Sequence, residues 1–337
     1  MSQKAKILKK HEITPEDEGE HKSDLLEWHY LNGFIEESAN NPYSGWKFIT
    51  NFTKARGFID NVMFLLFPPG KEPIDRSKYS MKYRSMKFSK GKLEGRVQND
   101  VIKGRFPNYE MYIEKTEENK FNSLDIKFSP LIKPKWAFVE KGGKAIADQS
   151  ELSQYAFLKT GIEGKLTVDD ISAPIKAVGY YEHIWATIDP KAFKGWMWYC
   201  SPNASKTTPT LSINIAIGLR PDDSLTTRFV HYTFDGETYH AFDDYDVEIL
   251  ETAVHDNMEY GTKVKVTQKL PNRELNIIIT RDKHPSTRTH QGGFAVLRLI
   301  TGGAWVKGYI IHENKKYEID GDSIGSSFLL SPSKSSK

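Results

Sequence analysis

The stretch IEGKLTVDDISAPIKAVGYYE, residues 162–182, indicates the fold most clearly. It contains a glycine, an apolar strand, an acidic turn at Asp169-Asp170, a second strand and a further glycine. Residues 306–326, VKGYIIHENKKYEIDGDSIGS, have the same outline around an acidic and amide turn. Two such hairpins predict two copies of one β unit, with a boundary near residues 186–195.

Short strand signals dominate the rest of the chain. They are aromatic or β-branched, are bounded by Gly, Pro or Asn, and cover residues 28–36, 45–54, 61–67, 78–89, 108–115, 121–130, 211–220, 227–234, 262–270, 274–281 and 305–321. Many short strands joined by tight turns are typical of antiparallel sandwiches or barrels, so we predict an all-β protein. Its 337 residues exceed the usual size of one core. We expect domains at 24–188 and 189–331, with polar tails at 1–23 and 332–337.

Composition excludes several classes of protein. The chain has 47 Lys and Arg residues against 44 Asp and Glu residues, and this charge balance is too even for a nucleic-acid binder. The single cysteine, Cys200, excludes an intramolecular disulfide. No signal peptide and no apolar run of about 18 residues is visible, so a cytoplasmic location is expected. The Lys-rich start is interpreted as a solvated tail, with peripheral membrane contact during substrate uptake as the alternative.

The strand that includes YYEHIW, residues 180–185, places an imidazole among aromatic rings. Alternation directs Tyr181, His183 and Trp185 to one face, and Glu182 with its even-numbered neighbours to the other. Ring faces attract positive charge and apolar walls hold a hydrocarbon, so this arrangement suits chemistry through a carbocation. The structural alternative is an aromatic core patch whose histidine makes a local hydrogen bond.

Other catalytic patterns are missing from the sequence. It contains no G-x-G-x-x-G, P-loop, H-E-x-x-H, C-x-x-C or G-x-S-x-G motif. The scattered His29, His231, His240 and His255 lack the close spacing of metal ligands. We therefore predict neither a metal nor a cofactor.

Five segments together resemble the carotenoid 1,2-hydratase/AttH-like family, which includes hydroxyneurosporene synthase. They are EWHYLNGFIE (27–36), GWKFITNF (45–52), LDIKFSPLIKP (124–134), GIEGKLTVDDISAPIKAVGYYEHIW (161–185) and WMWY (196–199). The resemblance implies two tandem lipocalin-like (calycin) antiparallel β-barrel domains with an apolar cavity at or near their interface. It also implies a cofactor-independent reaction at a carbon–carbon double bond of an isoprenoid or polyketide. The chain departs from the family pattern at His29 (usually Trp), Ala186 (usually Gly) and Ser326 (commonly Glu).

The resemblance also implies site residues. His183 and Trp185 correspond to the active-site histidine and tryptophan of the family, and Glu182 to its usual Asp/Glu. We expect His183 to orient or activate water, Trp185 and Trp198 to stabilise a cation, and Glu182 or a second-domain acid to protonate carbon. Substrate contacts are expected from Trp28, Tyr30, Trp46, Asn51, Tyr181 and Trp198.

Two other functions stay open at this stage. A lipocalin-like cavity can carry a lipid or isoprenoid without chemistry, and the serine at position 326 favours that alternative. A pericyclase would need only a shaped pocket that preorganises a polyene. We rank the hypothesis of a hydratase-like enzyme first, the carrier second and the pericyclase third.

Overall fold

The computed structural model describes residues 13–21, 26–55, 60–80, 86–117, 119–120, 122–136, 144–147, 150–187, 194–291 and 295–332. Within them, the one helix is the single turn α1 (Pro15–Glu18), and the elements otherwise are strands. The predicted all-β class is confirmed. No helix among the described residues is long and apolar enough to cross a membrane.

The first compact unit contains the described residues from 13 to 136 and from 152 to 187. Its antiparallel sheet has the order β4-β3-β2-β1-β14-β13-β10-β9-β8-β7-β6, with β5, β11 and β12 paired off this path. The strands are β1 (Leu26–Ile35), β2 (Lys47–Ala55), β3 (Asp60–Phe67), β4 (Ile74–Asp75), β5 (Lys78–Ser80), β6 (Lys87–Phe88), β7 (Leu93–Val97), β8 (Asp100–Arg105), β9 (Asn108–Ile113), β10 (Ser123–Pro130), β11 (Lys135–Trp136), β12 (Lys144–Ala147), β13 (Ser150–Val168) and β14 (Ile171–Thr187).

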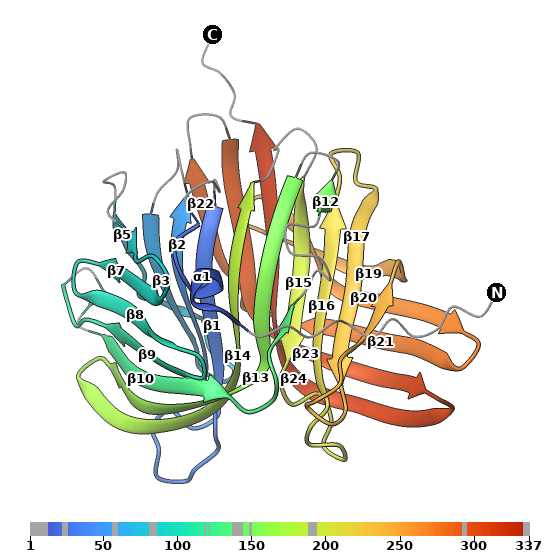
Figure 1. Ribbon diagram of the computed structural model, residues 1–337, viewed down its shortest axis with the longest axis horizontal. Helices are drawn as coiled ribbons and strands as arrows, with labels where there is room; N and C mark the ends of the chain where they lie inside the picture. The colour runs from blue at the N-terminus through green and yellow to red at the C-terminus, as the bar shows by residue number, and fades with distance from the viewer. Residues whose placement is uncertain are drawn as a thin grey trace. The chain divides into compact units, whose positions relative to one another are not determined.

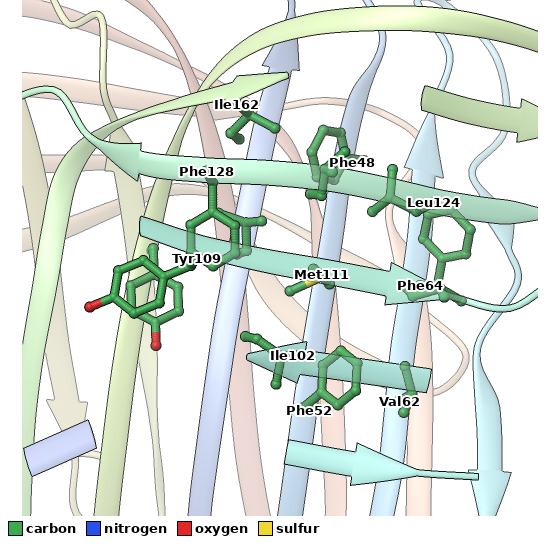
Figure 2. Close-up of a cluster of buried hydrophobic side chains, with 14 of the residues drawn as sticks. Phe48, Phe52, Val62, Phe64, Ile102, Tyr109, Met111, Leu124, Phe128 and Ile162 are labelled. Carbon is green, nitrogen blue, oxygen red and sulfur yellow. The ribbon is translucent and has the colours of Figure 1, made fainter. Parts of the chain in front are cut away.

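The sheet of the first unit folds back over its own core. Figure 2 shows Ile102, Met111 and Phe128 on β8, β9 and β10 facing the side chains of β2 and β3. In β9, NYEMYI alternates exposed and buried, and its buried positions all belong to this core. Period-two burial of this kind follows from the strand pleat and leaves every second side chain in solvent.

The second unit contains the described residues 144–147 and 194–332, together with the start of β13. Its sheet order is β18-β17-β16-β15-β24-β23-β21-β20-β19, with β22 paired to β23. The strands are β15 (Gly195–Ser201), β16 (Ser212–Leu219), β17 (Leu225–Thr233), β18 (His240–Asp243), β19 (Asp246–His255), β20 (Met258–Leu270), β21 (Arg273–Arg281), β22 (Ser286–Gln291), β23 (Ala295–His312) and β24 (Lys315–Pro332). This unit has its own core of Ile, Val and Tyr side chains.

The two expected hairpins are present and equivalent (Figure 1). β13–β14 turns at Asp169-Asp170 and β23–β24 turns at Glu313-Asn314, and both residues of each turn have positive φ, as type I′ turns require. Five residues before each turn stands a glycine in the same strained conformation, Gly164 at φ 153° and Gly308 at φ 145°. Each glycine packs against a backbone carbonyl of the neighbouring strand. The internal duplication therefore extends to backbone geometry.

The structure differs from the expected domain limits in two places. Residues 13–21 belong to the first unit rather than to a polar tail, because Asp17 and Glu18 are buried and hydrogen-bonded within it. Glu18 accepts hydrogen bonds from the Tyr109 hydroxyl (2.6 Å) and the Phe106 amide (2.9 Å). Strand β12 groups with the second unit, although its sequence position lies inside the first.

Candidate functional site

The pairing of β1 with β14 distributes the expected site residues over two faces. Glu27 lies opposite Trp185, His29 opposite His183, and Leu31 opposite Tyr181. Leu31, Tyr181 and Trp185 belong to the core of the first unit, so this is the inner face. The register continues without a shift along β1. A bulge that would direct Glu182 and His183 to one face is therefore absent from this pairing.

His183 is fully enclosed on the inner face. Its Nδ1 lies 3.0 Å from the main-chain oxygen of Asp17. A carbonyl oxygen only accepts, so Nδ1 carries a hydrogen and donates it. The other ring nitrogen, Nε2, lies 3.2 Å from Oε1 of Glu27. The imidazole is thus held between a carbonyl and a carboxylate.

Glu27 is the carboxylate of this arrangement, and it also binds His21. The Nδ1 atom of His21 lies 3.2 Å from Oε1, and the main-chain N–H of His21 lies 3.3 Å from both carboxylate oxygens. Burial alone would raise the pKa of Glu27, but its contacts with His183 and His21 outweigh burial and hold that pKa well below its usual range. Burial lowers the pKa of His183, against the opposing effect of Glu27. We call Glu27 and its histidines His21, His29 and His183 the inner cluster.

Aromatic rings surround the inner cluster. His29 stacks on His183 at 3.8 Å between ring centroids, and Trp185 stacks on His21 at 3.9 Å with an interplanar angle of 3°. Tyr155 meets the His183 ring edge-on at 5.4 Å. The walls are therefore apolar and rich in π faces, which favours a cationic centre among them.

A hollow of about 880 Å³ opens elsewhere in the first unit. Its floor includes Tyr109 and Phe128, while Lys103, Glu110 and Lys176 contribute charge to its lining. On the inner face, Tyr109 stacks on Tyr181 with ring centroids 5.6 Å apart, and Phe128 meets Tyr181 at a tilt with centroids 5.2 Å apart. His183 is not among the residues that line this hollow.

Glu182 lies on the opposite face of the sheet, in an outer cluster with Trp28, Lys135, Gln154 and Tyr180. Trp28 Nε1 donates to it at 3.1 Å, the Tyr180 hydroxyl at 2.6 Å, and the Gln154 amide also donates to it. Burial raises the pKa of Glu182 and lowers that of Lys135 to about 7. A joint action of Glu182 and His183 on one substrate is not supported, because the sheet lies between them.

The other expected substrate contacts are distributed over several places. Tyr30 and Asn51 are paired neighbours on β1 and β2 and lie on the outer face. Trp46 packs partly buried against the first core, edge-on to Tyr43. Trp198 is buried in β15 of the second unit, opposite Ser326. Of the expected set, Tyr181, His183 and Trp185 are the three that share the inner face.

Sequence reasoning did not identify Glu27 or His21. Glu27 stands two residues before His29, so strand alternation alone places both on one face, but only the β1–β14 register brings them to His183. His21 fell in the expected tail, where nothing in the sequence marked it. Among the described residues, His21, Glu27 and His183 are also the group that could hold a metal ion, with ligand atoms within 4.8 Å of one another.

Comparison with known proteins supports the fold but not a family assignment. No protein-family model matches the chain, and no curated protein sequence matches it. A putative AttH from Nitrosomonas europaea has a similar solved structure, with a TM-score of 0.72 at 14% identity over 94% of this chain and 97% of that one. Kievitone hydratase from Nectria haematococca gives 0.62 at 13% identity over 91% and 89% of the two chains. CghA with Sch210972 gives 0.56 at 7% identity over 91% and 88%.

These similarities define the class of fold. The chain has the tandem lipocalin-like antiparallel architecture of the AttH structure, and the predicted fold class is confirmed. At such identities the comparison concerns fold alone, so function has to be argued from the site.

Proposed function

We propose that this protein is an enzyme that adds water to, or removes it from, a carbon–carbon double bond of a hydrophobic, isoprenoid-like substrate, without an organic cofactor. The observation that carries the proposal is the buried His183–Glu27 pair inside an aromatic cage. Nδ1 of His183 donates to the Asp17 carbonyl, so Nε2, which faces Glu27, is the ring atom that would take up a proton. The hydratase named among the similar structures supports the reaction type.

Hydration of an alkene needs three things: protonation of carbon, shielding of the cation that forms, and removal of a proton from the attacking water. The His183–Glu27 pair suits the last step, because a low-pKa carboxylate stabilises the imidazolium that results. The ring faces of Tyr155, Tyr181 and Trp185 suit the second step.

Glu18 suits the first step better than Glu182. Burial raises the pKa of Glu18, and its Oε1 accepts a hydrogen bond of 2.6 Å from the Tyr109 hydroxyl. Tyr109 lines the hollow and stacks on Tyr181. A protonated carboxyl here would be on the inner side, whereas Glu182 is on the other face. Access to His183 requires residues 13–21 to move, because Asp17 and His21 lie against its ring.

The experiment is turnover of acyclic isoprenoids in water labelled with heavy oxygen. We expect a labelled tertiary alcohol, with rates at least about 100-fold lower in His183→Ala, Glu27→Gln and Glu18→Gln, the usual scale of general acid–base catalysis. Glu16→Gln is the matched control, since Glu16 is an exposed carboxyl on the same helical turn. Glu182→Gln separates the two assignments of the acid: retained turnover favours Glu18.

The second candidate is a carrier of hydrophobic molecules. It is favoured by one observation, that the 880 Å³ hollow includes Phe128 and Ile162 in its lining but not His183. Native mass spectrometry of protein from its own host decides between the two. An unmodified lipid that is released intact, with no labelled alcohol from any isoprenoid, would replace the enzyme with the carrier.

A further inference from the structure

The inner cluster contains three side chains whose donor atoms converge. His21 Nδ1, His183 Nε2 and a carboxylate oxygen of Glu27 lie within 4.8 Å of one another. They come from residues 6 and 156 positions away from Glu27. Sequence spacing therefore could not indicate a metal site. Metal binding at these residues would be a property separate from the proposed function.

The two distances from Glu27 to the histidines match the spacing of ligands in tetrahedral coordination. Glu27 Oε1 lies 3.2 Å from His21 Nδ1 and 3.2 Å from His183 Nε2. Zinc binds nitrogen and oxygen ligands at about 2.0–2.1 Å, which separates two ligands by roughly 3.3 Å at the tetrahedral angle. Three protein ligands with a fourth position left for water or substrate is the pattern of catalytic zinc sites.

The groups that hydrogen-bond to these ligands are also of the kind found around metal sites. Metal-binding histidines usually donate their second ring N–H to a carbonyl or carboxylate, and His183 does so to the Asp17 carbonyl at 3.0 Å. Ligating carboxylates are usually hydrogen-bonded as well, and Glu27 accepts the main-chain N–H of His21.

The hydrogen positions on the His183 ring support a cation at this site. Because Nδ1 of His183 must donate to a carbonyl, a neutral ring presents a lone pair at Nε2. That lone pair faces a carboxylate oxygen at 3.2 Å in a fully enclosed site. Two acceptors in contact need a cation between them, which is a proton or a metal ion.

The ligand types indicate which metal would bind. Two imidazoles and one carboxylate suit zinc and similar divalent transition metals, whereas magnesium and calcium prefer oxygen ligands alone. His21 is the ligand with an exposed edge, 17% of its side chain, while His183 and Glu27 are 0% and 2% exposed.

From this geometry we propose that His21, Glu27 and His183 form a binding site for one divalent transition-metal ion, zinc in the first instance. Three protein ligands would leave a fourth position for water or a substrate oxygen. An ion there would activate water in place of the imidazole, since zinc lowers the pKa of bound water to about 7.

The test is metal binding by the full chain, measured without reference to activity. Chelator-treated protein is titrated with Zn²⁺ against a chromophoric competitor, and with Co²⁺ followed by its visible spectrum. We expect one ion per chain, four-coordinate cobalt bands and a higher Tm with zinc. Removing a ligand should weaken zinc affinity by at least about 100-fold, since loss of a group that only hydrogen-bonds to a ligand already lowers affinity by about 10–100-fold.

Variants make the result specific. His21→Ala is the main variant, because His21 is the most exposed of the three ligands. His183→Ala and Glu27→Gln follow, each with a thermal unfolding curve. His255→Ala, an exposed histidine elsewhere, should bind like the wild type. Wild-type affinity no tighter than that of His21→Ala would overturn the site. So would a nitrogen NMR spectrum in which both ring nitrogens of His183 stay protonated with zinc present, because the cation between the acceptors would then be a proton.

Discussion

At the scale of single residues, Glu182 and His183 show that strand alternation can place two adjacent ionisable residues on opposite faces of a sheet. They are adjacent in the chain, yet one joins a lysine and an indole on the outer face while the other joins a carboxylate and two histidines inside. The pKa values of Glu182 and of Glu27, the partner of His183, also shift for different reasons. Burial dominates for Glu182, whereas contacts with histidine dominate for Glu27. The choice of acid and base therefore follows from the face, not from sequence proximity.

Lys135 allows a pH test at this scale. Burial lowers its pKa from the ordinary value of 10.5 to about 7. Between these values the unfolded chain holds a proton that the folded chain has lost, so stability rises with pH, by about 1.4 kcal/mol per unit from this group. We expect Lys135→Met to remove that part of the slope between pH 7 and pH 9.5, as measured by denaturant unfolding. Lys133→Met, an exposed neighbour, should keep the full slope; equal slopes in both variants would contradict the assignment.

At the scale of elements, one glycine of the long strand β13 has a backbone conformation that other residues rarely adopt. In β13, Gly164 has φ 153°, and a Cβ there would lie 2.1 Å from the Asp125 oxygen of β10. An L side chain rarely adopts this conformation, and the atoms that it would meet are backbone.

We therefore expect Gly164→Ala to cost more than about 2 kcal/mol of unfolding free energy, from backbone strain and overpacking together. Gly161→Ala on the same strand is the control, because the nearest atom to its Cβ is the flexible Leu131 side chain at 3.1 Å. It should cost less than about 1 kcal/mol. Urea unfolding measures the loss of unfolding free energy in both variants. Equal losses would show that position 164 does not need glycine.

The short segment with α1 covers the inner cluster. Glu18 holds it through Tyr109 and Phe106, and Asp17 contacts His183. Glu18→Ala removes both anchoring hydrogen bonds, so we expect faster modification of His183 by diethyl pyrocarbonate, by about 10-fold for each 1.4 kcal/mol of lost docking energy. The measurement is peptide mass spectrometry on chelator-treated protein. Glu16→Ala should react like the wild type, and an unchanged rate in Glu18→Ala would mean that the segment does not control access.

At the scale of the whole molecule, the chain has two units with separate cores. Phe64 is fully buried in the first core and Ile277 in the second. We expect Phe64→Ala to lower the stability of the first unit by about 3–5 kcal/mol, and Ile277→Ala that of the second by about 2–5 kcal/mol. Hydrogen exchange followed by mass spectrometry should show the loss of protection confined to the unit that carries each change. Loss spread over both units would indicate a single cooperative structure.

The extent of what could be predicted differs between fold and site. Alternation, turn residues and the repeated hairpin are local signals, so strands such as β1, β9 and β21 could be located from the sequence. Face assignment within β14 was equally accessible, because Tyr181, His183 and Trp185 follow the pleat. Glu27 could be placed on the face of His29, but its contact with His183, 156 positions away, depends on the register of β1 against β14. Register is decided by the summed packing of whole strands, not by any one residue.

The amino-acid sequence by itself determined the all-β class, the duplicated hairpin and the aromatic character of the strand around His183, because these follow from side-chain periodicity and turn chemistry over a few residues. The tertiary structure alone decided that His183 meets Glu27 and Asp17, that Glu182 belongs to the other face, and that residues 13–21 lie against the cluster. Those contacts arise when a sheet curls and brings distant segments together, so their energies exist only in the folded chain.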